Sequence, residues 1–280
     1  MRHAIDAVQW NQIAPNPKPA MPQINLLAVS VGNTRTRLGV FLDGELREVS
    51  TFRNGRTDRI ARAIEQAYQP LHGLDDAHVI MSSVNPEAGE AVLKLLNKQL
   101  DRTVYRVEKD LPIPIGRQLD PEAIVGEDRL LNAAAAFDKL GQACVVVDAG
   151  TAMTIDYVDG AGTFHGGAIV PGAQLMLDAL HQRTALLPEV EFEKPEELIG
   201  HNTAQAMLTG AFFGLRGIVR SVVEQYAVQT GQYPTVVATG GDAQVLFRDD
   251  EFVSRVVPDL GLRGIAVTLR KQLEQGEASA

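Results

Sequence analysis

Two stretches of this chain share one pattern, in which an apolar strand runs into a glycine turn and a second strand follows. The first stretch is VSVGNTRTRLGVF at residues 29–41, and the second is VVDAGTAMTID at residues 146–156. Apolar residues on both sides of a short glycine-containing turn are typical of a buried β-hairpin. Because the pattern occurs twice, it points to a duplicated fold with one such hairpin in each half.

Aligning the two stretches shows how far the similarity goes. The alignment pairs Gly32 with Gly150, Thr36 with Thr154, and Ser30 with Asp148. Any two buried hairpins share valine and glycine, so chance similarity is the alternative to duplication for the hairpins alone. The helices that follow both stretches favour duplication.

The first half of the chain alternates expected strands with expected helices. Asp43-Gly44 is a hairpin turn signal that follows the second strand. A helix is expected at 58–68, where apolar residues recur at helical spacing. A strand at 77–84 comes next, then a helix opened by Pro86, whose fixed φ suits a first helical turn, and then a strand at 103–107. This order predicts an α/β domain around a mixed sheet.

The second half begins in the same way. Residues 144–170 again show a strand, a glycine turn, a strand, a hairpin turn and a strand. A chain of 280 residues that is 45% hydrophobic is long enough for two modest cores. We therefore expect a first domain at 25–138 and a second at 139–280. A flexible extension is expected at 1–24, because the four prolines of APNPKPAMP disfavour helix and sheet.

Charge and cysteine content narrow the classes of partner. The net charge of −9 repels nucleic acid, so we expect a small-molecule partner. Cys144 is the only cysteine and precedes an apolar run, which predicts a buried thiol, no intrachain disulfide and a reducing, cytoplasmic location. Residues 1–24 lack the features of a signal peptide, and no apolar run is expected to span a bilayer, so no membrane association is predicted.

The two glycine turns suit phosphate binding. A strand that ends in a glycine turn with Asn or Thr lets backbone N–H groups approach phosphate oxygens. Two such turns are suited to grip one triphosphate, and a carboxylate just before a turn is a ligand for a hard cation. The alternative is that Gly32 and Gly150 only permit tight turns, and for either turn alone that alternative is the better explanation.

Two further segments carry groups suited to phosphoryl transfer. In VGEDRLLNAAAAF, Asp128 and Arg129 stand at the start of an Ala-rich helix, where the carboxylate can accept a proton and the guanidinium can hold an anion. The alternative is an Asp that balances the helix dipole beside a surface Arg. In VVATGGDAQVL, a strand enters Gly240-Gly241, a turn against which an adenine ring can lie, although such glycine pairs are common.

Taken in order, these segments resemble the type III pantothenate kinases of the acetate and sugar kinase, Hsp70 and actin superfamily. GNT at 32–34 resembles the first phosphate motif, GEDR at 126–129 the substrate motif and VVDAGTAMTID the second phosphate motif. HNTAQAM at 201–207 is similar to a substrate-contacting helix start, and TGG at 239–241 to the adenosine motif. The resemblance covers about Leu26 to Ile265, and the ordered set is specific although no single motif is.

The resemblance implies a fold and a reaction. The fold is α/β, with two similar ribonuclease H-like domains (the actin-like ATPase fold) and an interdomain cleft. The reaction is ATP-dependent phosphorylation of pantothenate, the first step of coenzyme A biosynthesis, with Mg²⁺ and a monovalent cation (K⁺ or NH₄⁺) as cofactors. The family is a homodimer. In this sequence, the expected helix at 203–230 carries a stripe of glycines that suits either a dimer contact or packing within the chain.

The resemblance also assigns roles to residues. Asp128 is the expected catalytic base, and Asp148 is the expected ligand of the monovalent cation. ATP and its phosphates are assigned to Ser30, Gly32, Asn33, Thr34, Arg37, Gly150, Thr151, Gly240 and Gly241. Pantothenate is assigned to Gln118, Gly126, Glu127, Arg129 and Thr203.

Three positions depart from the family pattern. The family has Asp at the position of Ser30, Tyr near Gln118 and Lys at the position of Arg37. A serine hydroxyl supplies no negative charge, so we expect weaker metal binding at the first phosphate turn. Three hypotheses follow, in this order: an active pantothenate kinase, a kinase of another small hydroxy acid, and a nucleotide-binding regulator without turnover.

Overall fold

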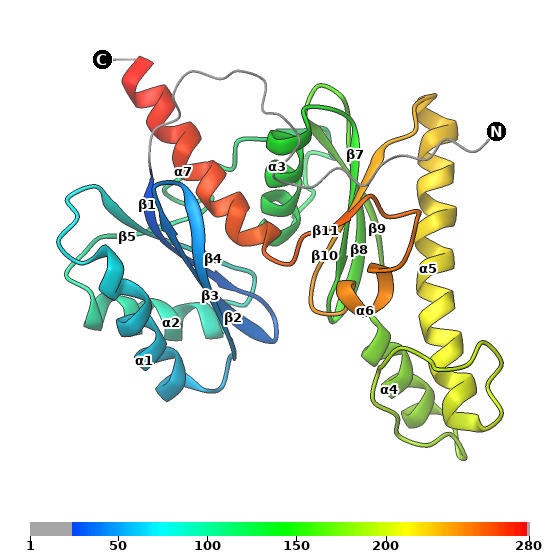
Figure 1. Ribbon diagram of the computed structural model, residues 1–280. Helices are drawn as coiled ribbons and strands as arrows, with labels where there is room; N and C mark the ends of the chain where they lie inside the picture. Colours follow the sequence, from blue (N-terminus) through cyan, green and yellow to red (C-terminus); the bar gives the residue numbers. More distant parts are fainter. Residues whose placement is uncertain (1–23, 279–280) are drawn as a thin grey trace. The chain divides into compact units, whose positions relative to one another are not determined.

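The computed structural model describes residues 24–278, which form two compact units, each built around one β-sheet (Figure 1). The first-sheet unit contains residues 24–116, 120–138 and 259–278, and the second-sheet unit contains residues 117–119 and 139–258. The C-terminal segment therefore packs with the first sheet, although it follows the second sheet in the chain. The expected extension lies, up to residue 23, outside the described residues.

The first sheet has five strands in the order β3-β2-β1-β4-β5. The strands are β1 Asn25–Val31, β2 Arg35–Leu42, β3 Glu45–Arg53, β4 Ala77–Ser83 and β5 Val104–Arg106. Strand β1 pairs antiparallel with β2 and parallel with β4, which confirms the predicted mixed sheet. Asp43 and Gly44 turn the chain between β2 and β3 with φ values of 52° and 80°, as a tight hairpin requires.

Helices cover both faces of the first sheet (Figure 1). The helices of this unit are α1 Thr57–Tyr68, the single turn η1 Gln69–Leu71, α2 Pro86–Gln99, α3 Glu127–Leu140 and α7 Leu260–Ala278. Helices α1 and α2 share a buried apolar cluster with one face of β1, β2 and β4. Helix α7 lies on the other face, where a Cβ at Gly39 would stand 3.0 Å from Leu262. Gly264 brings α7 close to α3, because a Cβ there would stand 2.3 Å from the Leu131 carbonyl oxygen.

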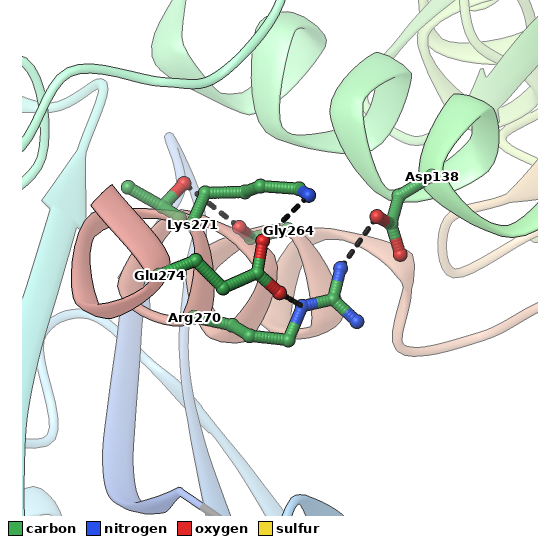
Figure 2. A network of polar contacts seen from close by, with 6 residues as sticks. Asp138, Gly264, Arg270, Lys271 and Glu274 are labelled. Carbon is green, nitrogen blue, oxygen red and sulfur yellow. Dashed lines mark hydrogen bonds and ion pairs between the residues drawn. The ribbon is translucent and has the colours of Figure 1, made fainter. Parts of the chain in front are cut away.

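Figure 2 shows the polar contacts that join α7 to the end of α3. Arg270 of α7 forms an ion pair of 2.5 Å with Asp138 of α3 and also reaches Glu274 at 3.6 Å. Lys271 binds the same Glu274 at 2.8 Å. Asp138 lies near the C-terminal, negative end of the α3 dipole, and the positive charge of Arg270 offsets the unfavourable carboxylate there. The helix that begins with the predicted substrate motif is thus fixed at its opposite end.

The second sheet has six strands in the order β11-β10-β7-β8-β9-β6. The strands are β6 Gly116–Arg117, β7 Cys144–Ala149, β8 Ala152–Val158, β9 Thr163–Pro171, β10 Thr235–Thr239 and β11 Arg255–Val256. Without the short β6, the order β9-β8-β7-β10-β11 repeats the first sheet strand for strand, with the same antiparallel hairpin and parallel neighbour. The duplication is therefore present in the fold. Cys144 is buried as predicted, and burial raises the pKa of its thiol to about 12.

The pairing of residues between the two hairpins differs by one position from the sequence alignment. Ser30 faces Arg37 across the first hairpin, and Asp148 faces Thr154 across the second. Arg37 therefore takes the place of Thr154, and the alignment of Thr36 with Thr154 is wrong. The physical reason is that the first turn contains one residue more than the second, which shifts β2 by one position.

The second sheet is packed against a long helix. The helices of this unit are α4 Ala173–Arg183, α5 Thr203–Thr230 and α6 Ala243–Phe247. By length and composition α5 is apolar enough to cross a membrane, since an 18-residue stretch of it has a mean hydropathy of 1.3, so the expectation that no run is long enough is wrong. Phe212, Leu215 and Val219 of α5, however, belong to the buried cluster of β7 and β8. This packing is that of a core helix.

Candidate active site

Most of the predicted site residues lie at two sheet edges, one in each unit, and Gln118 and Thr203 do not. In the first-sheet unit, the parallel strands β1 and β4 end side by side. In the second-sheet unit, the parallel strands β7 and β10 do the same. Ligands of open α/β sheets bind beyond the carboxyl ends of parallel strands, so each edge is where binding groups are expected.

The turn after β1 is held by the side chain of Asn54, which follows β3. Its Nδ2 donates hydrogen bonds to the carbonyl oxygens of Gly32 at 2.9 Å and Asn33 at 3.1 Å, and its Oδ1 accepts one from the Thr36 hydroxyl at 2.9 Å. The N–H of a trans peptide points opposite to its C=O. The amides of Asn33 and Thr34 therefore point away from Asn54, an orientation suited to receiving phosphate oxygens.

Ser30 lies half-buried near the end of β1, between two polar neighbours. Arg37 of β2 and Ser82 of β4 are its register partners in the sheet. The Arg37 guanidinium pairs with Asp259 at 2.6 Å, a carboxylate just before α7 that the sequence did not single out. The first hairpin thus presents a hydroxyl next to a cation whose charge is shared with Asp259.

The predicted catalytic base stands in the first turn of α3, as expected. The Asp128 carboxylate bends back toward residue 126, since a Cβ at Gly126 would stand 2.5 Å from Asp128 Oδ1. The same Oδ1 accepts a hydrogen bond from the Arg129 N–H at 2.8 Å. A side chain at 126 would therefore displace this carboxylate. Arg129 places a guanidinium on the same turn of α3.

Glu127 of the same turn points toward β4. Its Oε2 accepts a hydrogen bond from the Ser83 N–H at 3.1 Å. Burial raises the pKa of the Glu127 carboxyl, while hydrogen bonds from the Ser83 N–H and the Ser82 hydroxyl oppose that rise. Among charged neighbours, Glu108 raises this pKa further and Arg106 lowers it.

In the second-sheet unit, the turn after β7 is closed by backbone groups. The Gly150 N–H donates to the Ala152 carbonyl at 3.2 Å. The Gly172 N–H donates to the Thr151 carbonyl at 3.0 Å, and a Cβ at Gly172 would stand 2.0 Å from the Gly150 oxygen. Glycine at 172 is therefore needed for β9 to pass against the second predicted phosphate turn.

The predicted adenosine turn lies against the second phosphate turn. Gly240 has φ +97°, and a Cβ there would stand 2.4 Å from the Ala149 carbonyl oxygen and 2.5 Å from Asp148 Oδ1. The Asp242 N–H donates to the Ala149 carbonyl at 3.0 Å. The structure thus brings Asp148, Gly150, Gly240 and the residues beside them to one sheet edge.

The surroundings of Asp148 suit a monovalent cation. Thr154 faces Asp148 across the hairpin, and its buried hydroxyl has no hydrogen-bond partner within residues 24–278. A carboxylate beside an unsatisfied hydroxyl offers the oxygen ligands that hard cations prefer. No cluster of three or more His, Cys, Asp or Glu side chains able to hold a metal exists in that part of the chain.

Two predicted substrate residues belong to the second-sheet unit. Gln118 is exposed, and its backbone N–H donates to the Phe164 carbonyl at 3.0 Å. Thr203 begins α5 and lines an apolar pocket of about 300 Å³ together with Met176 and Met207. The other predicted substrate residues belong to the first-sheet unit, and they are Gly126, Glu127 and Arg129. The base Asp128 lies in that unit as well.

The comparison with known families agrees with the motifs. A family model described as type III pantothenate kinase matches residues 26–225. This chain belongs to the type III pantothenate kinase family. A type III pantothenate kinase from Syntrophotalea carbinolica is 34% identical over 250 residues, which cover 86% of this chain and 97% of that protein. The match confirms the family named from the sequence.

Solved structures similar to this family member share its fold. A protein described as a Baf family transcriptional activator from Campylobacter jejuni has a TM-score of 0.58 and 19% identity, covering 89% of this chain and 99% of that one. MreB5 of Spiroplasma citri bound to ADP has a TM-score of 0.50 and 11% identity, covering 90% and 99%. These likenesses concern the fold alone, and they confirm the actin-like ATPase architecture.

Proposed function

We propose that this protein transfers the terminal phosphoryl group of ATP to the primary hydroxyl of pantothenate, the first step of coenzyme A biosynthesis. The observation that carries the proposal is the family match over residues 26–225. The start of α3 supports it, because a carboxylate and a guanidinium share one helical turn there. A kinase of another hydroxy acid and a regulator without turnover, the two alternatives from the sequence, have no such support.

In the proposed reaction, the first-sheet unit handles the acceptor and part of the phosphate chain. Asp128 accepts the proton of the attacking hydroxyl, and Arg129 holds the pantothenate carboxylate. The amides of Asn33 and Thr34 bind phosphate oxygens, with Arg37 adding positive charge. Mg²⁺, when bound with ATP, neutralises phosphate charge during transfer. The Ser30 hydroxyl would donate a hydrogen bond to water bound to that ion.

In the same proposal, the second-sheet unit handles the rest of the nucleotide. Gly150 and Thr151 offer the second phosphate turn, and the adenosine lies along Gly240-Gly241. Asp148 and Thr154 hold the monovalent cation, K⁺ or NH₄⁺. Gln118 and Thr203, in contrast, contact pantothenate.

We further propose that the protein is a cytoplasmic homodimer that pairs through α5. The stripe Gly210, Gly214 and Gly217 has no atom within 4 Å of an added Cβ, so this face is open. Phe213, between two of these glycines in the chain, is an exposed apolar side chain of α5. Small residues let a second helix approach closely. Sedimentation of the Gly214→Arg variant should show a monomer, and an unchanged sedimentation coefficient would contradict this interface.

The experiment that tests the function follows product and nucleotide together. ATP, Mg²⁺, K⁺ and pantothenate are incubated with the wild type, Asp128→Asn and the exposed control Asp101→Asn, and phosphopantothenate is measured by mass spectrometry. Asp128→Asn should lower kcat by roughly 10²–10⁴-fold while ATP still raises its melting temperature. Full activity of Asp128→Asn would refute the base assignment. ATP turnover with another hydroxy acid but not with pantothenate would refute the substrate.

A further inference from the structure

A series of hydrogen bonds joins the substrate motif to the first phosphate turn, entirely within the first-sheet unit. It begins at Glu127, whose Oε2 accepts from the Ser83 N–H at 3.1 Å. Glu127 directly precedes Asp128 in the first turn of α3. The contact therefore ties the turn that carries the proposed base to the end of β4.

The series continues through the Ser83 hydroxyl. It donates to the Asn85 carbonyl at 2.9 Å and accepts from the Asn85 N–H at 3.3 Å. A Cβ at Gly89 would stand 2.4 Å from the Ser83 Oγ, so glycine at 89 leaves the space in which this hydroxyl lies. Ser83 thus holds the segment between β4 and α2 in one conformation.

Asn85 completes the series with both ends of its amide. Its Oδ1 accepts from the Ala88 N–H at 3.0 Å, which caps α2. Its Nδ2 donates to the Asn33 carbonyl at 3.2 Å, in the first phosphate turn. One side chain therefore binds the helix start and the phosphate turn together, and Asn33 is held from two sides, by Asn54 and by Asn85.

We propose that Glu127 and Asn85 are positioning residues, which hold Asp128 and the first phosphate turn in one fixed arrangement. The inference rests on the proposed function, because this arrangement matters to a rate only if a phosphate at Asn33 reacts with a hydroxyl at Asp128. It replaces the sequence-based expectation that Glu127 contacts the substrate. The Glu127 carboxylate is engaged by β4, so its effect on the reaction passes through the placement of α3.

The two roles for Glu127 predict different kinetics. A positioning residue affects the alignment of the reacting groups, and small misplacements lower kcat with little effect on ground-state binding. We expect Glu127→Ala to lower kcat by roughly 10–100-fold and to change the KM for pantothenate by less than about threefold. Glu127→Gln should recover most of the rate, since a Gln oxygen still accepts the Ser83 N–H. A raised KM for pantothenate with unchanged kcat would overturn the proposal in favour of substrate contact.

A double-mutant cycle tests whether Glu127 and Asn85 act through one network. Asn85→Ser retains a capping oxygen for α2 but removes the amide that reaches Asn33. Combined with Glu127→Ala, it should lower kcat little more than the more damaging single variant does, because residues of one network are not additive. Losses that multiply would show independent effects and overturn the coupling.

Hydrogen exchange separates this proposal from the proposed function. Amides at 32–36 should exchange faster in Glu127→Ala and in Asn85→Ser than in the wild type, and the exposed control Glu87→Ala should leave them unchanged. Unchanged exchange in both variants would overturn the network. Because this readout needs no turnover, an inactive wild type would refute the kinase assignment while faster exchange would still support the network.

Discussion

The two hairpins at the sheet edges share one backbone design but are anchored by different means. Both turns have a backbone hydrogen bond from their glycine N–H, Gly32 to the Arg35 carbonyl at 2.9 Å and Gly150 to the Ala152 carbonyl at 3.2 Å. The first turn is held in addition by side chains, with Asn54 and Asn85 both donating to its carbonyl oxygens. The second turn is held by backbone contacts that leave no room for a Cβ at Gly172 or Gly240. A turn anchored by side chains changes when those side chains change, whereas a turn anchored by backbone tolerates no added atom beside it. The comparison shows that duplication conserved the strand order and not the means of holding the turn.

The hairpins also differ in the sign of the charge that they present. In the first, the hydroxyl of Ser30 faces Arg37, and in the second, the carboxylate of Asp148 faces the hydroxyl of Thr154. The first hairpin therefore carries a guanidinium on its second strand, paired with Asp259, and the second carries a carboxylate on its first strand. In the proposed function, the first arrangement serves phosphate binding and the second serves binding of a cation.

The largest effect is expected where the second hairpin is closed by backbone. Gly240→Ala places a Cβ 2.4 Å from the Ala149 carbonyl at φ +97°. Strain and overpacking together should lower the free energy of unfolding by about 2–4 kcal/mol. Gly160→Ala is the matched control, because a Cβ at Gly160 meets nothing within 4 Å. Urea denaturation measures both, and equal stabilities would contradict the backbone account of this turn.

A smaller effect is expected from giving the first hairpin the charge of the second. Ser30→Asp adds a carboxylate at the end of β1, where it can orient water on Mg²⁺. The Mg²⁺ concentration for half-maximal turnover should fall by roughly tenfold, equivalent to about 1.4 kcal/mol. Ser30→Asn introduces a side chain of nearly the same shape as Asp but without its charge, and it should leave the Mg²⁺ requirement unchanged. If Ser30→Asn shifts it equally, charge is not what separates the two hairpins.

The sequence predicts the parts of this comparison that depend on local pattern. The strands, the hairpin turn at Asp43-Gly44 and α5 at 203–230 follow from periodicity and turn residues within a few positions. Asp128 and Arg129 stand at a helix start as expected. Nothing local indicates that Arg37 binds a carboxylate 222 residues away or that Asn85 reaches a carbonyl 52 residues away. Asn85 before Pro86 does signal a helix cap, but its second hydrogen bond depends on the tertiary fold.

The smallest effect concerns the charge of Glu127, which is linked to the first hairpin through Ser83 and Asn85. Burial raises the pKa of Glu127, so its carboxyl holds a proton more tightly in the folded than in the unfolded chain. Its contribution to stability is therefore complete below the ordinary pKa of Glu, at about 4.3, and is lost as pH rises through the raised pKa. The stability of the wild type relative to Glu127→Gln should consequently fall as pH rises above the ordinary pKa of Glu and through the raised pKa of Glu127.

Urea denaturation at a series of pH values checks the sign of this change. The free energy of unfolding of the wild type could instead rise relative to that of Glu127→Gln as pH rises. That result would mean that the helix dipole and the two serine donors lower the pKa of Glu127 by more than burial raises it. The arrangement around the first turn would then depend on the negative charge of Glu127, as the cation site proposed at the second turn depends on that of Asp148. A stability difference that falls as pH rises would mean that Glu127 holds α3 through the hydrogen bond from the Ser83 N–H, which Gln also accepts. The first hairpin would then need no carboxylate charge at this position.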